Sequence, residues 1–229
     1  MVDLKVAPCS HEAAKYAVMN WHYSKAMPNS KLVKFGVWEK GRFIGAVIYG
    51  SGATPHLGSP YGLDQTQVCE LVRVALTVHQ APVSEIVAKT LHLLKLSNPG
   101  LCIVVSFADP DEGHSGKIYQ AGNWIYNGTS PSARFFKING KKTHPRTIGL
   151  AGGIQSIDWV RTNLDRDAEV IVTAPKLRYL YPLNKPMRRV LNKIALPYPN
   201  AVEGLEASHL DSVKEVQVQS LPTAPESIS

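Results

Sequence analysis

Long apolar runs are absent from this chain of 229 residues. No stretch of about 18 consecutive apolar residues occurs. The N-terminus carries acids and polar breaks where a signal peptide would have a continuous apolar core. These absences argue against a membrane-spanning helix and a secretory leader. We therefore expect a cytoplasmic protein with no membrane partner.

Cysteine is also scarce. The three cysteines, Cys9, Cys69 and Cys102, form no Cys-x-x-Cys pair, and the last two lie inside the apolar runs QVCELV and LCIVV. A thiol in such a run behaves as a small hydrophobic group. The pattern therefore argues against a disulfide framework and against a structural zinc site.

Acidic residues are outnumbered and unevenly placed. The chain carries 25 Lys and Arg against 18 Asp and Glu, for a formal net charge of +7. Residues 131–200 hold thirteen of the cations and only four acids, whereas residues 201–229 hold five acids and one lysine. Such clustering of positive charge favours a polyanionic partner, although a basic surface that is merely solvated would have the same composition.

The composition predicts one domain followed by a tail. A hydrophobic content of 44% suffices for a full core, and no internal repeat or long linker precedes residue 200. We assign residues 1–150 to a catalytic domain and 151–200 to a basic extension packed on the same domain. Residues 201–229 are predicted to be an acidic tail without fixed structure.

The N-terminal part combines helix and strand patterns. Apolar residues at helical spacing predict a helix over 11–20. The β-rich runs 32–39 and 42–49 predict a hairpin, because Lys40-Gly41 between them is a turn signal. A long loop rich in glycine and proline follows over 50–65.

A strand, a helix and a second strand come next. VCELVRVAL predicts a strand over 68–76, and LCIVVSF predicts a buried central strand over 101–107. Between them an apolar stripe predicts a helix over 84–96, for which Ser84 is a suitable N-cap. Parallel strands joined through a helix place reacting groups at their carboxyl ends.

Asp109 lies at one such strand end, which makes it a candidate for chemistry. Its alternative role is that of a turn-forming Asp-Pro. A short helix over about 115–121 and a strand over 124–128 complete this part of the chain.

This order of elements resembles the GCN5-related N-acetyltransferase fold. The stretch from Tyr119 to Trp124, YQAGNW, is similar to that fold's Tyr-x-x-x-Gly-Phe, with Asn123 in place of the glycine. Asparagine tolerates the left-handed conformation better than most residues. The resemblance implies an α/β fold with a mixed central sheet flanked by helices, here with a basic C-terminal extension.

The same resemblance implies acetyl-CoA as cofactor, with Tyr119 as the acid that protonates the departing thiolate. Tyr119 could instead be a helix residue packed on the sheet. Arg73 is mid-strand among apolar neighbours, where a guanidinium needs an anionic partner, so we assign it to the cofactor. The loop after this strand, TVHQAPVSEI, lacks the glycines that hold the pyrophosphate in acetyltransferases. An anion could still dock on the helix N-terminus near Ser84, or Ser84 could merely cap that helix.

A closer resemblance covers nearly all of residues 18–199. The segments WHYSKAMPNSKLVKFGVWE, GAVIYGSGATPHLGSPYGL, CELVRVAL, ADPDEGHSGKIYQAGNWIYNG and KLRYLYPLNKPMRRVLNKIALPYP are together similar to the Mom proteins of bacteriophages and prophages. The resemblance implies conversion of adenine N6 in phage DNA to N6-carbamoylmethyladenine, inside the host bacterium. That modification protects the DNA from host restriction.

The Mom resemblance also assigns residues to the site. His22 and Tyr23, in the HYS motif, and Asp109 become candidates for removing a proton from the adenine amine. The same three, with His114 in the adjacent loop, could hold iron or another divalent metal. His22 and Tyr23 could instead only cap and pack a helix end, and His114 could simply lie in its loop.

Double-stranded DNA is the expected partner. Trp21, Trp124 or a loop tyrosine could pack on a base taken out of the duplex. The loop that holds His56 is a candidate lid or DNA-facing element. The basic stretch 176–193 interleaves cations with tyrosines, which suits phosphate contact and stacking, although the tyrosines could pack on the core instead. The predicted DNA-binding residues are Lys176, Arg178, Lys185, Arg188 and Arg189.

Two other functions stay open at this point. One is an acetyl-CoA-dependent N-acetyltransferase that acts on a protein or a small amine. The other is a noncatalytic DNA-binding protein, which the convergence of polar candidates at strand ends disfavours. A homodimer is possible, but no sequence feature decides the oligomeric state.

Overall fold

The computed structural model describes residues 2–199, which divide into two compact units. The first unit comprises residues 2–54, 71–99 and 198–199, and the second comprises residues 55–70 and 100–197. The predicted acidic tail lies outside the described residues. Within the described part, no helix is long and apolar enough to cross a membrane.

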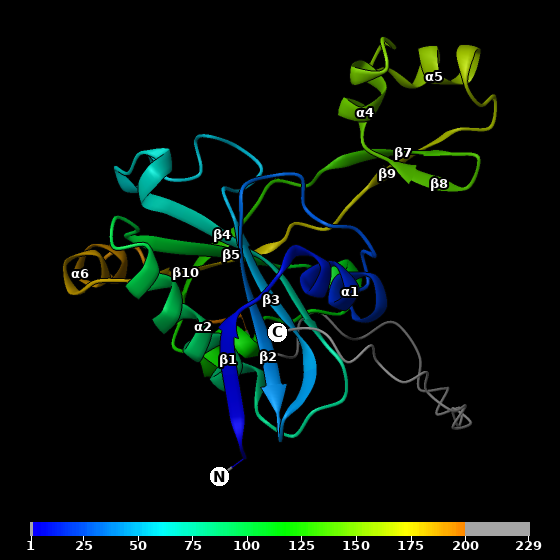
Figure 1. Ribbon diagram of the computed structural model, residues 1–229. Coiled ribbons are helices and arrows are strands. Elements are labelled where there is room, and N and C mark those ends of the chain that lie inside the picture. Colours follow the sequence, from blue (N-terminus) through cyan, green and yellow to red (C-terminus); the bar gives the residue numbers. More distant parts are fainter. Residues whose placement is uncertain (1, 200–229) are drawn as a thin grey trace. The chain divides into compact units, whose positions relative to one another are not determined.

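The elements within residues 11–129 follow the predicted order, and the strand before them and the elements after them were not predicted (Figure 1). The first unit contains β1 (Leu4–Pro8), α1 (His11–Trp21), β2 (Leu32–Glu39), β3 (Arg42–Gly50), most of β4 (Val68–Leu76) and α2 (Val83–Ser97). The second contains the start of β4, β5 (Ile103–Ala108), α3 (Lys117–Ala121), β6 (Ile125–Thr129), β7 (Arg134–Ile138), β8 (Lys141–Thr143), α4 (Pro145–Leu150), α5 (Ile157–Asn163), β9 (Glu169–Val172), β10 (Leu177–Pro182) and α6 (Lys185–Asn192), with short 3₁₀ turns at Ser59–Tyr61, Gln65–Gln67 and Pro110–Glu112.

Seven of the strands form a mixed sheet. Their hydrogen-bonded order is β1-β2-β3-β4-β5-β10-β6, with β4 and β5 parallel and β10 antiparallel to both β5 and β6. The predicted mixed α/β sheet flanked by helices is therefore confirmed, as is the parallel pair joined through a helix. The C-terminal basic stretch supplies β10, an interior strand, and α6.

Helices cover both faces of the strands in the first unit. Helix α1 packs its small residues on Ala46 and Ile48 of β3. On the opposite face of β3, the hydroxyl of Tyr49 lies 2.7 Å from that of Thr90 on α2. The β2–β3 hairpin turns at Lys40 and Gly41, with φ values of 52° and 76°, as its sequence predicts.

The start of α2 corrects one prediction. Ser84 is not the N-cap, because the helix begins at Val83 and Pro82 occupies the cap position without a side-chain cap bond. The fixed φ of proline suits this position, and the Pro82 carbonyl accepts the N–H groups of Glu85 and Ile86. Ser84 thus lies within the first helical turn.

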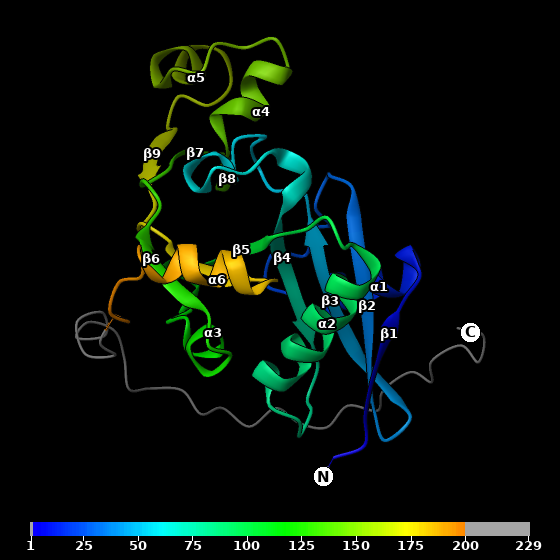
Figure 2. The ribbon, with the colours of Figure 1, turned by 90° about the vertical axis from the view of Figure 1, so that its left-hand side faces the viewer.

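Helices also cover both faces of β5 and β10 in the second unit. Helix α6, which faces the viewer in Figure 2, buries Leu191 against Ile103, Val105 and Leu180. On the other face, Tyr119 of α3 stacks on Tyr179 of β10, with ring centroids 4.9 Å apart. Alternate residues of each strand therefore serve two different cores.

A smaller layer in the second unit has its own core. Strands β8-β7-β9 form a three-stranded sheet, and α4 and α5 cover one face of it. Phe136, Ile148, Val160 and Ala168 are buried between them. Residue 150, the predicted end of the catalytic domain, is the last residue of α4 and belongs to this layer.

The packing of α3 on β10 requires a glycine at position 116. Gly116 has a φ of 78°, and a Cβ there would collide with the ring and hydroxyl of Tyr179. Gly62 has a similar φ of 69° with open space around its Cβ position. We expect Gly116→Ala to lower the free energy of unfolding by roughly 1–3 kcal/mol more than Gly62→Ala, because only the first adds overpacking to backbone strain. Urea unfolding of both variants measures the difference, and equal losses would contradict this account.

Candidate catalytic site

Asp109 occupies the carboxyl end of β5, as predicted. Its Oδ1 accepts the backbone N–H of Asp111 at 3.2 Å, so it caps the following 3₁₀ turn. Its Oδ2 lies 2.7 Å from the ammonium of Lys176, and its side chain is only 14% exposed. Asp109 therefore has the turn-forming role that the sequence allowed. It also forms an ion pair with Lys176, a cation of the C-terminal stretch.

Tyr119 lies at the centre of an aromatic cluster in the second unit. Ser106, on β5, donates its hydroxyl proton to the phenolic oxygen of Tyr119 at 2.8 Å. Trp124 and Tyr119 pack edge to face with ring centroids 5.1 Å apart, and Tyr179 stacks on Tyr119. A donor aimed at the phenolic oxygen stabilises negative charge there, which suits an acid that gives up its proton.

Asn123 has a φ of 56°, so the left-handed conformation expected at this position is confirmed. The turn it makes brings Trp124 back against α3, and the backbone N–H of Trp124 donates to the carbonyl of Tyr119. Trp124 is 1% exposed. It therefore belongs to the core, and the idea that it packs on an extrahelical base is wrong.

His22 and Tyr23 leave the end of α1 with their rings 4.3 Å apart. His22 is buried, and its Nδ1 accepts the backbone N–H of Ser24 at 3.1 Å. Because a backbone N–H can only donate, Nδ1 is an acceptor and the neutral ring carries its proton on Nε2. In this tautomer Nδ1 is an acceptor and Nε2 is a donor.

The guanidinium of Arg73 donates hydrogen bonds to two backbone carbonyl oxygens. Its Nη1 donates to the carbonyl of Val72 at 2.7 Å, and its Nε donates to that of Ala26 at 3.3 Å. These bonds orient the guanidinium.

The loop between β4 and α2 contains an internal anion. The carboxylate of Glu39 accepts the N–H of Ala81 at 2.8 Å and that of Gln80 at 3.0 Å. The bond from Ala81 is the main reason that the pKa of Glu39 lies below its usual value, against the opposing effect of burial. Two N–H groups of the loop expected to hold a pyrophosphate are thus already engaged.

The predicted catalytic residues belong to different units. His22, Tyr23, Arg73 and Ser84 lie in the first unit, and Asp109 and Tyr119 lie in the second. Residues 2–199 contain no group of three or more His, Cys, Asp or Glu side chains arranged to hold a metal ion. The metal-binding set predicted from the sequence, His22, Tyr23 and Asp109, includes a tyrosine, and its members come from both units. This set stays a prediction.

A family model described as the Mom protein family matches residues 3–200. The chain belongs to the Mom family. This confirms the resemblance found in the sequence. Methylcarbamoylase mom of Escherichia phage Mu is 28% identical over 206 residues, which cover 86% of this chain and 84% of that protein.

Solved acetyltransferase structures show a fainter likeness to this Mom family chain. Aminoglycoside acetyltransferase AAC(6')-Ib in complex with coenzyme A and kanamycin is 10% identical, with a TM-score of 0.47 over 83% of this chain and 98% of that one. Spermidine/spermine N-acetyltransferase SpeG from Vibrio cholerae is 11% identical, with a TM-score of 0.44 over 81% and 96%. At these values the likeness says nothing of substrate or cofactor.

The predicted DNA-binding residues of this Mom family chain have different surroundings. Lys176 pairs with Asp109, and Arg178 donates to the carbonyl of Thr129 at 3.2 Å. Arg188 lies 5.7 Å from the centre of the Tyr181 ring, while Lys185 and Arg189 are exposed on α6. The stretch is thus partly structural: Tyr179 is fully buried, as the core-packing alternative required.

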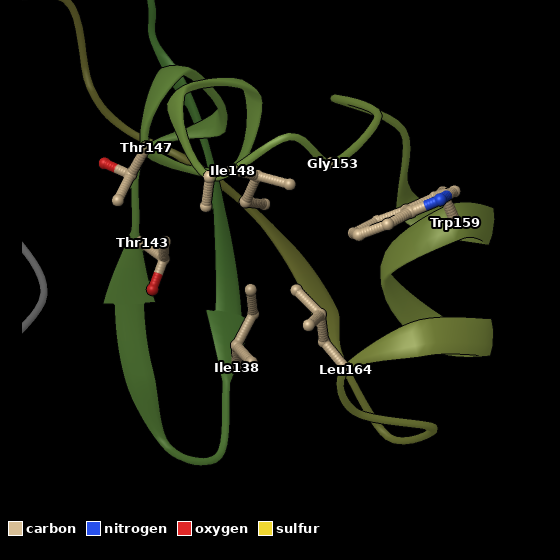
Figure 3. A pocket seen from close by; sticks show the side chains of 8 residues that line it. Ile138, Thr143, Thr147, Ile148, Gly153, Trp159 and Leu164 are labelled. Atoms are coloured by element: carbon tan, nitrogen blue, oxygen red, sulfur yellow. The ribbon is translucent and has the colours of Figure 1, made fainter.

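A separate apolar pocket of about 290 Å³ lies in the smaller layer of the second unit (Figure 3). Ile138, Ile148, Trp159 and Leu164 line it. None of the predicted catalytic or DNA-binding residues contributes to it.

Sequence reasoning missed two polar groups of the site. Ser106 is the one polar residue in the run LCIVVSF, and that exception could have drawn attention to it. Glu39 offered no such signal, because its partners are backbone N–H groups 41 and 42 residues further on.

The Glu39 contact predicts acid-sensitive stability. The pKa of Glu39 is lower in the folded than in the unfolded protein, so its stabilisation is present above the ordinary value of 4.5 and is lost as the pH falls through the lowered one. We expect Glu39→Gln to lower the thermal midpoint at pH 7, with the gap from wild type closing on acidification. Glu85→Gln, at an exposed position on α2, serves as control and should leave the midpoint nearly unchanged. A gap independent of pH in thermal melts would refute the assignment.

Proposed function

We propose that this protein is a transferase that places a carbamoylmethyl group on the N6 amine of adenine in DNA. The match to the Mom family over residues 3–200 carries the proposal. The relative in phage Mu is named a methylcarbamoylase, which supports the nature of the transferred group. Protection of phage DNA from restriction is the biological role proposed with it.

Adenine N6 is paired in a duplex, so the base must leave the stack before it reacts. The N6 lone pair is delocalised into the ring, and a base must remove a proton as the new bond forms. We assign this role to Asp109, whose carboxylate is held by Lys176 and by the turn it caps. His22, with its proton on Nε2, is assigned to orient or polarise an acceptor atom by donating a hydrogen bond.

Tyr119 is proposed to protonate the group that leaves the donor. Ser106 donates to its phenolic oxygen and would stabilise the charge that develops there. The stacked Tyr179 and the edge of Trp124 fix the ring, so the hydroxyl needs no reorganisation during the step.

Acetyl-CoA is the donor implied by the acetyltransferase resemblance, and the β4–α2 loop does not fit its pyrophosphate. That loop lacks glycine, and Glu39 occupies the N–H groups of Gln80 and Ala81. An acetyl group alone would also give N6-acetyladenine, whereas a carbamoylmethyl product needs an amide nitrogen. We therefore assign the donor no binding residues in this loop.

DNA is the proposed partner, and exposed cations on α6 support phosphate contact. Lys185 and Arg189 remain proposed DNA ligands. Iron or another divalent metal at His22, Tyr23 and Asp109 stays a proposal from the family resemblance, and no step above depends on it.

Asp109→Asn tests the proposed base. We expect the carbamoylmethyl-sized mass gain on deoxyadenosine to fall by a factor on the order of 10²–10⁴, since the amide cannot accept the proton. Mass spectrometry of nucleosides from cells that express each form measures the yield. Asp158→Asn, on the exposed side of α5, should leave the yield unchanged.

The wild type decides between functions in the same experiment. An acetyl-sized gain would indicate plain acyl transfer to DNA. Unaltered deoxyadenosine under good expression would count against DNA modification and in favour of acetyl transfer to a protein or small amine.

Tyr119→Phe tests the proposed acid. The variant keeps the stacked ring and loses only the hydroxyl, so we expect a drop in product on the order of 10²-fold. Ser106 also loses its buried acceptor, so the free energy of unfolding should fall by about 1–3 kcal/mol, and yields are compared at a temperature at which the variants remain folded. Tyr126→Phe removes a hydroxyl from the same aromatic cluster and should retain full yield. Equal yields from the two variants would remove Tyr119 from the mechanism.

A further inference from the structure

The β7–β8 hairpin concentrates positive charge outside the stretch predicted to bind DNA. Residues 134–146, RFFKINGKKTHPR, contain five lysines and arginines and no acid. The hairpin turns at Asn139 and Gly140, with φ values of 48° and 75°. This Asn-Gly turn matches the twist of the paired strands and gives a regular two-stranded ribbon.

The two faces of the β8-β7-β9 sheet differ in chemistry. One face carries Phe136 and Ile138, and the core of the smaller layer together with its apolar pocket lies against it. Cross-strand pairing places Lys137 opposite Lys142, and Phe135 opposite Ile171, on the other face. Lys137 is 49% exposed in its side chain, so this outer face is open to solvent.

An aromatic ring on the outer face is framed by basic groups. The ammonium of Lys142 lies 4.7 Å from the centre of the Phe135 ring. His144 meets the edge of the same ring at 5.2 Å. A flat ring beside cations is the arrangement that packs on a sugar or base while the cations contact phosphates.

The turn of the hairpin is held in place by a bond from another segment. The backbone N–H of Asn139 donates to the Asp165 carboxylate at 2.6 Å. At the other end, His144 caps α4 by accepting the N–H of Arg146 at 3.0 Å. The first bond fixes the turn before any ligand arrives, which lowers the entropy lost on binding.

Acidic neighbours neutralise only part of this charge. Glu169 pairs with Lys137 at 3.4 Å, and both side chains are about half exposed or more, so the attraction is weak. Across residues 2–199, no ion pair involves Arg134, Lys141, Lys142 or Arg146. Four cations of the hairpin therefore remain for an external anion.

We propose that the β7–β8 hairpin, together with the start of α4, is a second DNA-binding surface, which grips the sugar-phosphate backbone of duplex DNA. Lys142 and Phe135 lie together on its outer face, where the cation contacts a phosphate and the ring packs against a sugar or a displaced base. Lys141 pairs with Ile138 and so lies on the opposite face of the hairpin, and Arg146 lies on α4; both are exposed and contact neighbouring phosphates. The inference rests on the proposed function and adds to it a surface that anchors the substrate.

Charge reversal tests the phosphate contacts. Lys141→Glu/Lys142→Glu is compared with Lys15→Glu/Lys95→Glu, which changes the net charge equally at exposed positions of the first unit. Binding to a fluorescent duplex is measured by anisotropy over a range of salt concentrations. We expect the hairpin variant to bind at least about tenfold more weakly, with a salt slope reduced by about 2, because each lost phosphate contact removes about 0.9 from the slope. Thermal melts confirm that both variants fold.

Phe135→Leu tests the ring separately. It keeps an apolar side chain on the strand, and we expect an affinity loss on the order of tenfold with an unchanged salt slope, since no charge is removed. Two results together would overturn the proposed surface: wild-type affinity for DNA in Phe135→Leu, and equal affinities in the hairpin variant and its charge-matched control. The proposed modification of DNA would then still stand.

Two further outcomes separate the alternatives. No binding of duplex DNA by the wild type would overturn both this surface and the proposed function. Binding of poly-glutamate with the same dependence on Lys141 and Lys142 would assign the hairpin surface to acidic polypeptides. It would overturn the assignment of that surface to DNA.

Discussion

The hydrogen bonds of β10 determine how the second unit is organised. This strand comes from residues 177–182 and inserts between β5 and β6, so it is interior although it lies late in the chain. Its insertion buries Tyr179 beneath α3 and brings Lys176 against Asp109. The strand and the residue just before it therefore supply both the packing that fixes Tyr119 and the cation that pairs with the carboxylate. Burial of the strand explains why a basic stretch also contains apolar and aromatic residues.

A second constraint acts in the first unit, where an anion built into the protein fills the loop after β4. Glu39 comes from the end of β2 and satisfies two backbone N–H groups, those of Gln80 and Ala81. Such a carboxylate stabilises the loop without any ligand.

The sequence predicted the elements between residues 11 and 129, left those of residues 130–199 unassigned, and predicted long-range partners poorly. Periodicity identified the helix over 11–20, the hairpin at Lys40-Gly41 and the parallel pair around α2, because each depends on local pattern. Ser84 was misplaced, since Pro82 competes for the same cap position through its backbone. Position at a strand end predicted Asp109, but its pairing with Lys176 across 67 positions left no local trace. The same holds for the burial of Trp124, which depends on a strand that arrives only later in the chain.

The late arrival of β10 also determines when the protein can mature on the ribosome. Until residues 177–182 have left the exit tunnel, β5 and β6 each present an unpaired edge, and the apolar residues of β5 lack half of their cover. A nascent chain in that state exposes unpaired strand edges that can pair with other chains, so it requires protection from aggregation. The sheet can therefore close only after residues 177–182 have emerged, long after β5 has been made.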